Sequence, residues 1–165
     1  MLKRITTRSV RAHGGAFAIV ASRYNAEFVD AMVRAAQAEL RRAGAKVRVV
    51  RVPGAYEIPV VAARLARQST INHQLSAIIC LGVILRGETT HAAHIGEAVS
   101  GALMDIQVET EVPVIHEVLL LENREQARVR CLDKKHNRGT EAAQTALEMA
   151  RVMAGLREAD DDIPF

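Results

Sequence analysis

The sequence predicts a single α/β domain, a three-layer sandwich in which helices flank both faces of a four-stranded parallel sheet. Short, continuous apolar runs recur along the 165 residues, as expected of strands that are buried on both faces. Each run is followed by a segment with helical periodicity, and strands that alternate with helices at these lengths build parallel sheets. A chain of this length can also bury a core of its own without disulfides or metals.

Two strand-helix units are predicted in the first half of the chain. Residues 15–22 form a short apolar run bounded by glycines, which is typical of a buried strand. The segment 26–44 then changes to helical periodicity and ends at Gly44, a residue type that commonly stops helices. A second strand over 46–52 and a second helix over 56–68 follow. The apolar face of the first helix consists of Phe28, Val29, Met32, Ala35, Ala36 and Leu40.

The second half continues the alternation. The apolar segment 76–85 predicts a third strand, and residues 90–109 predict a long helix. A fourth strand is expected over 113–120, and two further helical patterns follow it, at 123–131 and 140–157.

These elements define one domain over residues 16–158. An N-terminal extension at 1–15 is expected before it, and a C-terminal tail at 159–165 after it. No sequence repeat and no low-complexity linker divides the domain further.

Composition restricts the classes of function. Aromatic residues make up only 3% of the chain and the net charge of +3 is spread along it, so no nucleic-acid partner is expected. No segment is long and apolar enough to span a membrane. Cys80 and Cys131 have no CxxC spacing, so they are predicted to be free thiols in a reducing, cytoplasmic compartment.

The polar motif "RGETTH", residues 86–91, follows the third predicted strand, where ligands bind in parallel sheets. Gly87 permits close backbone approach, and Glu88, Thr89 and Thr90 open the next helix with free N–H groups. Such a helix start can bind phosphate or another anion. An ordinary Thr N-cap with nothing bound is an equally good interpretation from geometry alone.

A metal site is the third interpretation of the same motif. His91 and His94 share a helix face, but no further histidine has ligand spacing and HExxH is absent, so no metal is expected.

Three other segments are candidates for a site. "VPGAYEIP", residues 52–59, places Tyr56 and Glu57 at a strand-to-helix junction, although Pro-Gly turns and acids in a first helical turn are common without function. Tyr24 could stack on a planar ring, but an aromatic residue at a strand end is more often part of the core. The basic segment 128–138 would ordinarily be a solvated face.

Four motifs are similar to those of the lumazine synthase family: "VPGAYEIP", "LGVILRGETTH", "ETEVPVIHEV" and "NRGTEAAQTALEMA". The match extends from about residue 16 to residue 155. The pair VPGA(F/Y)EIP and GxxxRGxTxH, in this order and about thirty residues apart, is highly specific. The resemblance implies a flavodoxin-like arrangement of the parallel sheet.

The resemblance also implies a reaction, the penultimate step of riboflavin biosynthesis. The family condenses 5-amino-6-(D-ribitylamino)uracil with 3,4-dihydroxy-2-butanone 4-phosphate to 6,7-dimethyl-8-ribityllumazine, releasing phosphate and water. It uses no metal and no cofactor. A non-catalytic module that binds flavin or lumazine is the alternative, since a fold does not determine function. A phosphosugar isomerase-like enzyme that uses His91 and Glu88 is a third, less favoured functional hypothesis.

Site residues are implied position by position. Glu88 and Thr89 match the phosphate-binding helix start, His91 the proton-transferring histidine, and Arg130 the arginine that reaches the phosphate. The positions that match the binding site of the ribityl-bearing pyrimidine are Tyr24, Ala55, Tyr56, Glu57, Val83, Ile84, Leu85, His116 and Arg138.

The chain departs from the family pattern at several positions. Many members have phenylalanine where this chain has His116, and lysine where it has Arg138. Ala92 and Ala93 replace a Tyr-Asp pair that often follows the catalytic histidine, and residues 131–137 lack the glycines of some members.

Assembly is the last expectation. The predicted helix after the phosphate loop is rich in Ala, Gly and Ser, and small residues allow backbones to approach closely. Packing within one chain is the alternative to packing between chains. The resemblance implies pentamers, or multiples of pentamers, with active sites shared between adjacent subunits and with His116 and Arg130 donated across the interface. Riboflavin synthase is a candidate partner.

Overall fold

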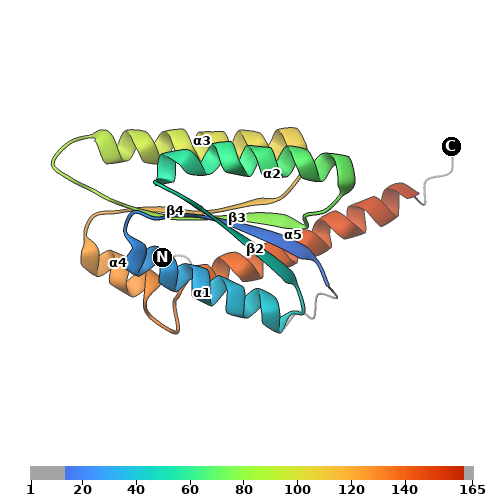
Figure 1. Cartoon of the computed structure of the whole chain (residues 1–165), viewed down its shortest axis with the longest axis horizontal. Coiled ribbons are helices and arrows are strands. Elements are labelled where there is room, and N and C mark those ends of the chain that lie inside the picture. The colour runs from blue at the N-terminus through green and yellow to red at the C-terminus, as the bar shows by residue number, and fades with distance from the viewer. Residues whose placement is uncertain (1–13, 162–165) are drawn as a thin grey trace.

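A computed structural model describes residues 14–161 of the chain (Figure 1). The elements are β1 (Ala16–Ser22), α1 (Ala26–Arg42), β2 (Lys46–Val52), η1 (Ala55–Glu57), α2 (Ile58–Asn72), β3 (Ala77–Leu85), α3 (His91–Thr110), β4 (Val114–Leu121), α4 (Arg124–Cys131) and α5 (Arg138–Asp161). This order confirms the predicted α/β class. Most of the expected N-terminal extension and the end of the expected tail lie outside the described residues.

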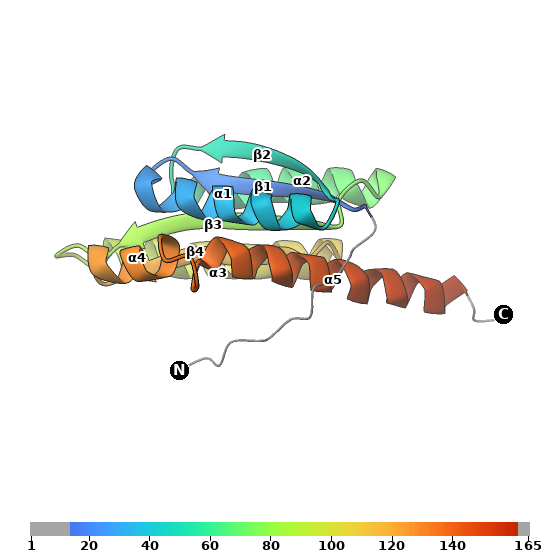
Figure 2. The ribbon, with the colours of Figure 1, turned by 90° about the horizontal axis from the view of Figure 1, so that it is seen from below.

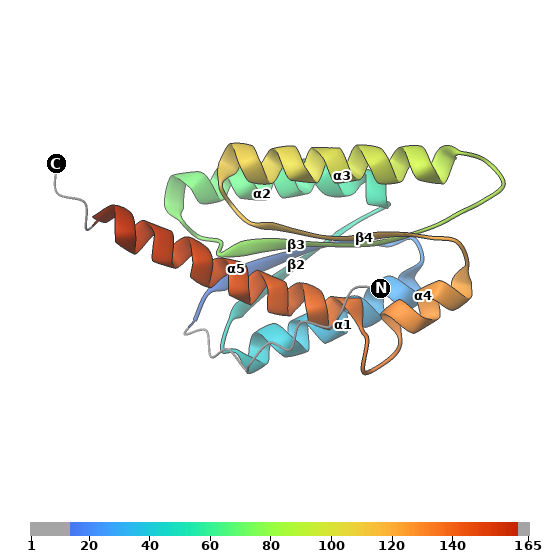
Figure 3. The ribbon, with the colours of Figure 1, turned by 180° about the vertical axis from the view of Figure 1, so that it is seen from behind.

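The four strands form one parallel sheet with the order β2-β1-β3-β4. Helices α2 and α3 cover one face of this sheet, and α1, α4 and α5 cover the other (Figures 1 and 3). The chain moves outward from β1 to β2 and then crosses to the other side of β1, which is the flavodoxin-like order with its reversal between β1 and β3.

Strand β1 supplies side chains to two apolar layers. Phe17, Ile19 and Ala21 pack into the layer of α1 and α5. Ala18 and Val20 pack into the layer of α2 and α3. Because successive side chains of a strand point to opposite faces, a strand that is covered on both sides must be apolar at every position, and this is the run that the sequence displays.

Helix α5 begins at Arg138, two residues before the predicted start, because Asn137 caps it. The Asn137 Oδ1 accepts a hydrogen bond from the Gly139 N–H (2.8 Å), and its Nδ2 donates to the Cys131 carbonyl (2.5 Å). The capping side chain thereby ties the start of α5 to the end of α4. Gly139 lies against the backbone of α1, where a Cβ atom would approach the Met32 carbonyl oxygen to 2.1 Å.

The remaining differences from the sequence prediction are small. The expected helix at 56–68 is a short 3₁₀ turn followed by α2, with Pro59 in its first turn, where the missing N–H costs nothing. Cys80 and Cys131 are buried free thiols, as predicted.

The far half of α5 extends beyond the sheet (Figure 2). Within residues 14–161 no helix combines the length and the apolar character needed to cross a membrane.

Candidate active site

A cavity of about 750 Å³ opens at the carboxyl ends of β1 and β3, where the strand order reverses. This is the place where ligands bind in open parallel sheets, and the volume suits a small organic molecule. The predicted site residues that line it are Tyr24, Ala55, Tyr56, Glu57, Val83, Ile84, Leu85 and His91. Asn25, Gly54, His94, Ile95 and Ala98 also line it.

Tyr24 lies at the mouth of the cavity and not in the core, with 72% of its surface exposed. The general expectation that an aromatic residue at a strand end is buried is therefore wrong here. Two backbone N–H groups, of Arg23 and Tyr24, donate to the Pro53 carbonyl (both 3.1 Å) and hold the loop after β1 against the loop after β2. The ring is thus presented to solvent on a fixed backbone and is free to stack on a ligand.

Asn25, which lines the cavity, links the end of β1 to β3. Its backbone adopts a left-handed conformation (φ 55°) immediately before α1, a conformation that asparagine tolerates better than most residues. Its Nδ2 donates a hydrogen bond of 2.7 Å to the Val83 carbonyl on β3. Asn25 was not among the site residues predicted from the sequence, although an asparagine between a strand and a helix start is a signal for such a turn.

Glu57 is held by the glycine turn before it. Its Oε2 accepts a hydrogen bond from the Gly54 N–H (2.9 Å), so Oε1 is the carboxylate oxygen left for a ligand hydroxyl group. A Cβ atom on Gly54 would lie 2.9 Å from Oε2 and 3.1 Å from the Tyr24 ring. Glycine therefore suits this close approach, because a side chain here would move the Glu57 carboxylate away from the turn and press on the Tyr24 ring.

The motif predicted to bind phosphate forms an exposed loop that leads into α3. Residues 86–90 are all exposed, and the helix begins at His91. The Thr90 side chain makes no capping hydrogen bond, whereas the Thr89 Oγ1 accepts a long one from the His91 N–H (3.4 Å). The Thr90 side chain therefore does not accept a hydrogen bond from the first turn of α3, as it would in an ordinary Thr N-cap with nothing bound.

His91 and His94 both line the cavity, on one face of α3. In the part of the chain that the structure describes, no group of three His, Cys, Asp or Glu side chains is placed to hold a metal ion. Histidine is also the side-chain type that most readily transfers protons near neutral pH.

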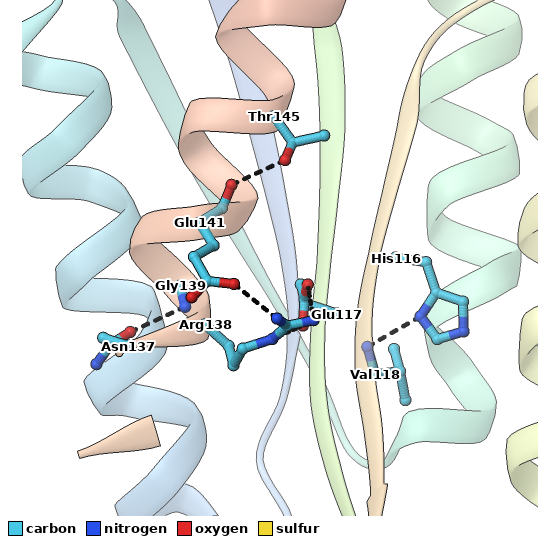
Figure 4. A network of polar contacts seen from close by, with 8 residues as sticks. All are labelled: His116, Glu117, Val118, Asn137, Arg138, Gly139, Glu141 and Thr145. Carbon is cyan, nitrogen blue, oxygen red and sulfur yellow. Dashed lines mark hydrogen bonds and ion pairs between the residues drawn. The ribbon is translucent and has the colours of Figure 1, made fainter. Parts of the chain in front are cut away.

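His116 lies outside this cavity, on β4, with its ring against α3. Its Nδ1 accepts a hydrogen bond from the Val118 N–H (3.1 Å), so the neutral ring carries its proton on Nε2 (Figure 4). The Nε2 lies 2.7 Å from the Ser100 Oγ, which donates to the Gly96 carbonyl (2.8 Å). Burial against α3 lowers the pKa of His116. Both ring nitrogens are satisfied within one chain, although the residue as a whole is exposed.

We expect His116 to titrate below 6.5 and to have Nδ1 as its unprotonated nitrogen. Since the pKa is lower in the folded chain than in the unfolded chain, the unfolded chain takes up the proton first. The stability that this residue contributes is therefore complete above pH 6.5 and is lost as the pH falls. Heteronuclear NMR of the ring nitrogens, assigned with a His116→Phe variant, checks both points. A proton on Nδ1 at neutral pH would contradict the tautomer.

Arg130 and Arg138 lie on the opposite side of the sheet from α3, and neither lines the cavity of its own chain. Arg130 is exposed on α4, whereas Arg138 opens α5 and pairs with Glu117 and Glu141 (Figure 4). The basic segment 128–138 is therefore only in part the solvated face that its composition indicates, since Cys131 is buried within it.

Fold and cavity together define a flavodoxin-like α/β protein with a ligand-sized site at the reversal of its strand order. Comparison with known proteins specifies the family. The profile of the 6,7-dimethyl-8-ribityllumazine synthase family matches residues 14–154. The chain belongs to this family.

Two relatives illustrate the match. A 6,7-dimethyl-8-ribityllumazine synthase from Stenotrophomonas maltophilia (strain R551-3) is 41% identical over 143 residues, which cover 85% of this chain and 90% of the relative. A protein of the same name from Xanthomonas oryzae pv. oryzae (strain PXO99A) is 41% identical over 140 residues, covering 83% of this chain and 88% of that one.

Proposed function

We propose that this chain catalyses the condensation of 5-amino-6-(D-ribitylamino)uracil with 3,4-dihydroxy-2-butanone 4-phosphate to 6,7-dimethyl-8-ribityllumazine, with release of phosphate and water. The observation that carries the proposal is the convergence of Tyr24, Glu57 and His91, from three separate segments, on one cavity of suitable volume. The family match agrees with it. Nothing in the cavity favours a module that only binds a flavin.

The cavity offers each part of the pyrimidine substrate a partner. The Tyr24 ring is available to stack on the heterocycle, and the free Oε1 of Glu57 can accept a hydrogen bond from a ribityl hydroxyl group. Val83, Ile84 and Leu85, at the end of β3, also line the cavity. Holding two substrates in one oriented site supplies most of the acceleration of a condensation of this type.

The start of α3 serves the second substrate. Glu88 and Thr89 lie on the exposed loop directly before the helix, whose N-terminal N–H groups favour a phosphate anion. His91 lies between this loop and the cavity, where it can transfer protons during imine formation, elimination of phosphate and ring closure.

We expect His91→Ala to lower kcat about a hundredfold without abolishing activity, and to leave both KM values nearly unchanged, because orientation supplies more of the acceleration than proton transfer does. Steady-state kinetics with each substrate varied in turn provide the measurement. His94→Ala, which removes the other histidine of the cavity from the same helix, is the matched variant and should lose less activity. The reverse order of the two losses would assign proton transfer to His94.

The experiment that tests the function mixes the purified protein with both substrates and follows lumazine absorbance together with inorganic phosphate. Product above the uncatalysed rate, unchanged after dialysis against a chelator, supports the proposal. Binding of lumazine without turnover would favour the non-catalytic module. Activity on a pentulose phosphate alone would favour an isomerase.

Two observations support an assembly of several chains. The first is that His116 and Arg130, both implied to contact substrate, lie outside the cavity of their own chain. The second is an unpartnered face of α3, where a Cβ atom on Gly101 would meet nothing within 4 Å and where Met104 and Val108 are 56% and 68% exposed. Packing within one chain therefore does not account for the small residues of this face.

We accordingly propose a cyclic pentamer, or a multiple of it, in which each site is completed by a neighbour. Light scattering after size exclusion gives the mass, and a fully active monomer would refute the assembly. Mixing His91→Ala chains with Arg130→Ala chains under exchange conditions tests the shared site, because about a quarter of the sites of a randomly mixed ring would then have both residues intact. Activity above the average of the two separate variants is expected. Its absence, with proven subunit exchange, would place both residues in one chain's site.

A further inference from the structure

Glu117 is the single carboxylate of strand β4, and it is only 8% exposed. It is paired side-on with one guanidinium group: the Arg138 Nε donates to its Oε2 (3.1 Å), and the Arg138 Nη2 lies 3.0 Å from its Oε1 (Figure 4). This bidentate geometry fixes both the position and the plane of the guanidinium group. Burial raises the pKa of Glu117, and the charge and hydrogen bond of Arg138 oppose that rise.

A second carboxylate completes the orientation of Arg138. The Nη1 donates to the Glu141 Oε2 (2.6 Å), one turn further along α5. A guanidinium group has five N–H donors, so three are used in this cluster and two are left, one on each terminal nitrogen. The Arg138 side chain is 24% exposed, which leaves a route for these two donors to a ligand.

Arg130 belongs to the same electrostatic cluster. Its charge acts on the Glu117 carboxylate together with that of Arg138, so Glu117 lies within electrostatic range of both cations. Arg130 lies on α4 and Arg138 at the start of α5, and the buried carboxylate of Glu117 attracts both cations. Arg130 has no carboxylate at ion-pair distance within residues 14–161, whereas Arg138 has two.

We propose that Glu117 is a positioning residue that holds Arg138 in a fixed orientation, so that Arg138 and Arg130 together form one recognition surface for the two substrates. The inference rests on the proposed function, because it assigns this surface to the same reaction. In this arrangement Arg130 keeps its full charge for the phosphate. Arg138, whose charge is offset by Glu117 and Glu141, acts as a directed donor to a neutral oxygen of the pyrimidine substrate.

The identity of residue 138 follows from the same geometry. An ammonium group is a point charge and cannot make the side-on pair that Glu117 accepts, so arginine is required opposite this carboxylate. The acid on β4 and the arginine on α5 therefore act as a unit, and their substitutions should not be additive.

The test compares Glu117→Gln, Arg138→Lys and the double variant in steady-state kinetics. We expect each single variant to raise KM for the pyrimidine substrate about five- to thirtyfold, with kcat and KM for the butanone phosphate within about twofold. The double variant should have a KM for the pyrimidine substrate no higher than that of the more impaired single variant. Glu125→Gln is the matched control, since it removes an exposed carboxylate paired with Arg128 on α4 and should change neither constant.

Folding and assembly are measured on every variant by circular dichroism and light scattering. If Glu117→Gln fails to assemble, Glu117→Asp keeps the charge and alters only the side-on geometry, and it should still raise KM for the pyrimidine. An unchanged KM in assembled Glu117→Gln or Glu117→Asp, additive effects in the double variant, or loss of assembly in both Glu117 variants would overturn the inference. Failure of the proposed function itself would be seen separately, as absence of lumazine formation by the unaltered chain.

Discussion

Gly139→Ala is expected to destabilise the protein by about 4 kcal/mol or more, an effect large enough to prevent folding of a marginally stable domain. The added Cβ atom would lie 2.1 Å from the Met32 carbonyl oxygen and 2.6 Å from its carbonyl carbon. Both are backbone atoms of α1, which cannot rotate away as a side chain could. Helix α5 would have to move off α1, exposing the apolar contacts that Ala142 and Ala146 make in the core.

Urea denaturation gives the free energy of unfolding for this variant. Gly155→Ala is the control, because it makes the same change in the same helix at a position where the Cβ atom meets nothing within 4 Å. There the substitution should be neutral or should stabilise the protein by up to about 1 kcal/mol, through helix propensity and the reduced freedom of the unfolded chain. Equal changes in the free energy of unfolding at the two glycines would show that close packing of α5 on α1 is not the reason for the loss of stability in Gly139→Ala.

Arg130→Ala is expected to raise KM for the butanone phosphate roughly ten- to a hundredfold, and KM for the pyrimidine far less. A charge-assisted hydrogen bond to a phosphate contributes about 1.5–3 kcal/mol, which corresponds to that range. Arg130 is suited to this role because it is exposed at the carboxyl end of the sheet and has no carboxylate at ion-pair distance among the described residues.

Arg128→Ala is the matched comparison for this measurement. It removes a cation from the same helix, but one that is already paired with Glu125 at 2.7 Å and that lies in solvent. Its effect on either KM should be small. If Arg128→Ala and Arg130→Ala raised KM for the butanone phosphate equally, general electrostatic attraction would explain the result. The specific contact of Arg130 with the phosphate would then be refuted.

Much of the candidate site could be predicted because its residues stand in short motifs at strand ends. Tyr56 and Glu57 belong to one such motif and His91 to another, and a parallel sheet brings its strand ends to one edge. Asn25 and Gly54 were missed because their roles depend on contacts with Val83 and Glu57 that no local pattern displays. Glu117 was missed because its partner, Arg138, lies on another element. An acid in a mostly apolar strand is nevertheless a signal of a buried partner.

The sequence by itself determined the type and order of the secondary-structure elements, because alternation of buried strands with amphipathic helices is a local property of the chain. The tertiary structure decided which strands are neighbours, and hence that the loops after β1, β2 and β3 surround one cavity. It also decided that Tyr24 is exposed, that His116 is held as a neutral ring, and that Arg138 meets Glu117. Each of these depends on strand register and on contacts between residues far apart in the chain, where the free energy of packing, and not the local pattern, selects the partner.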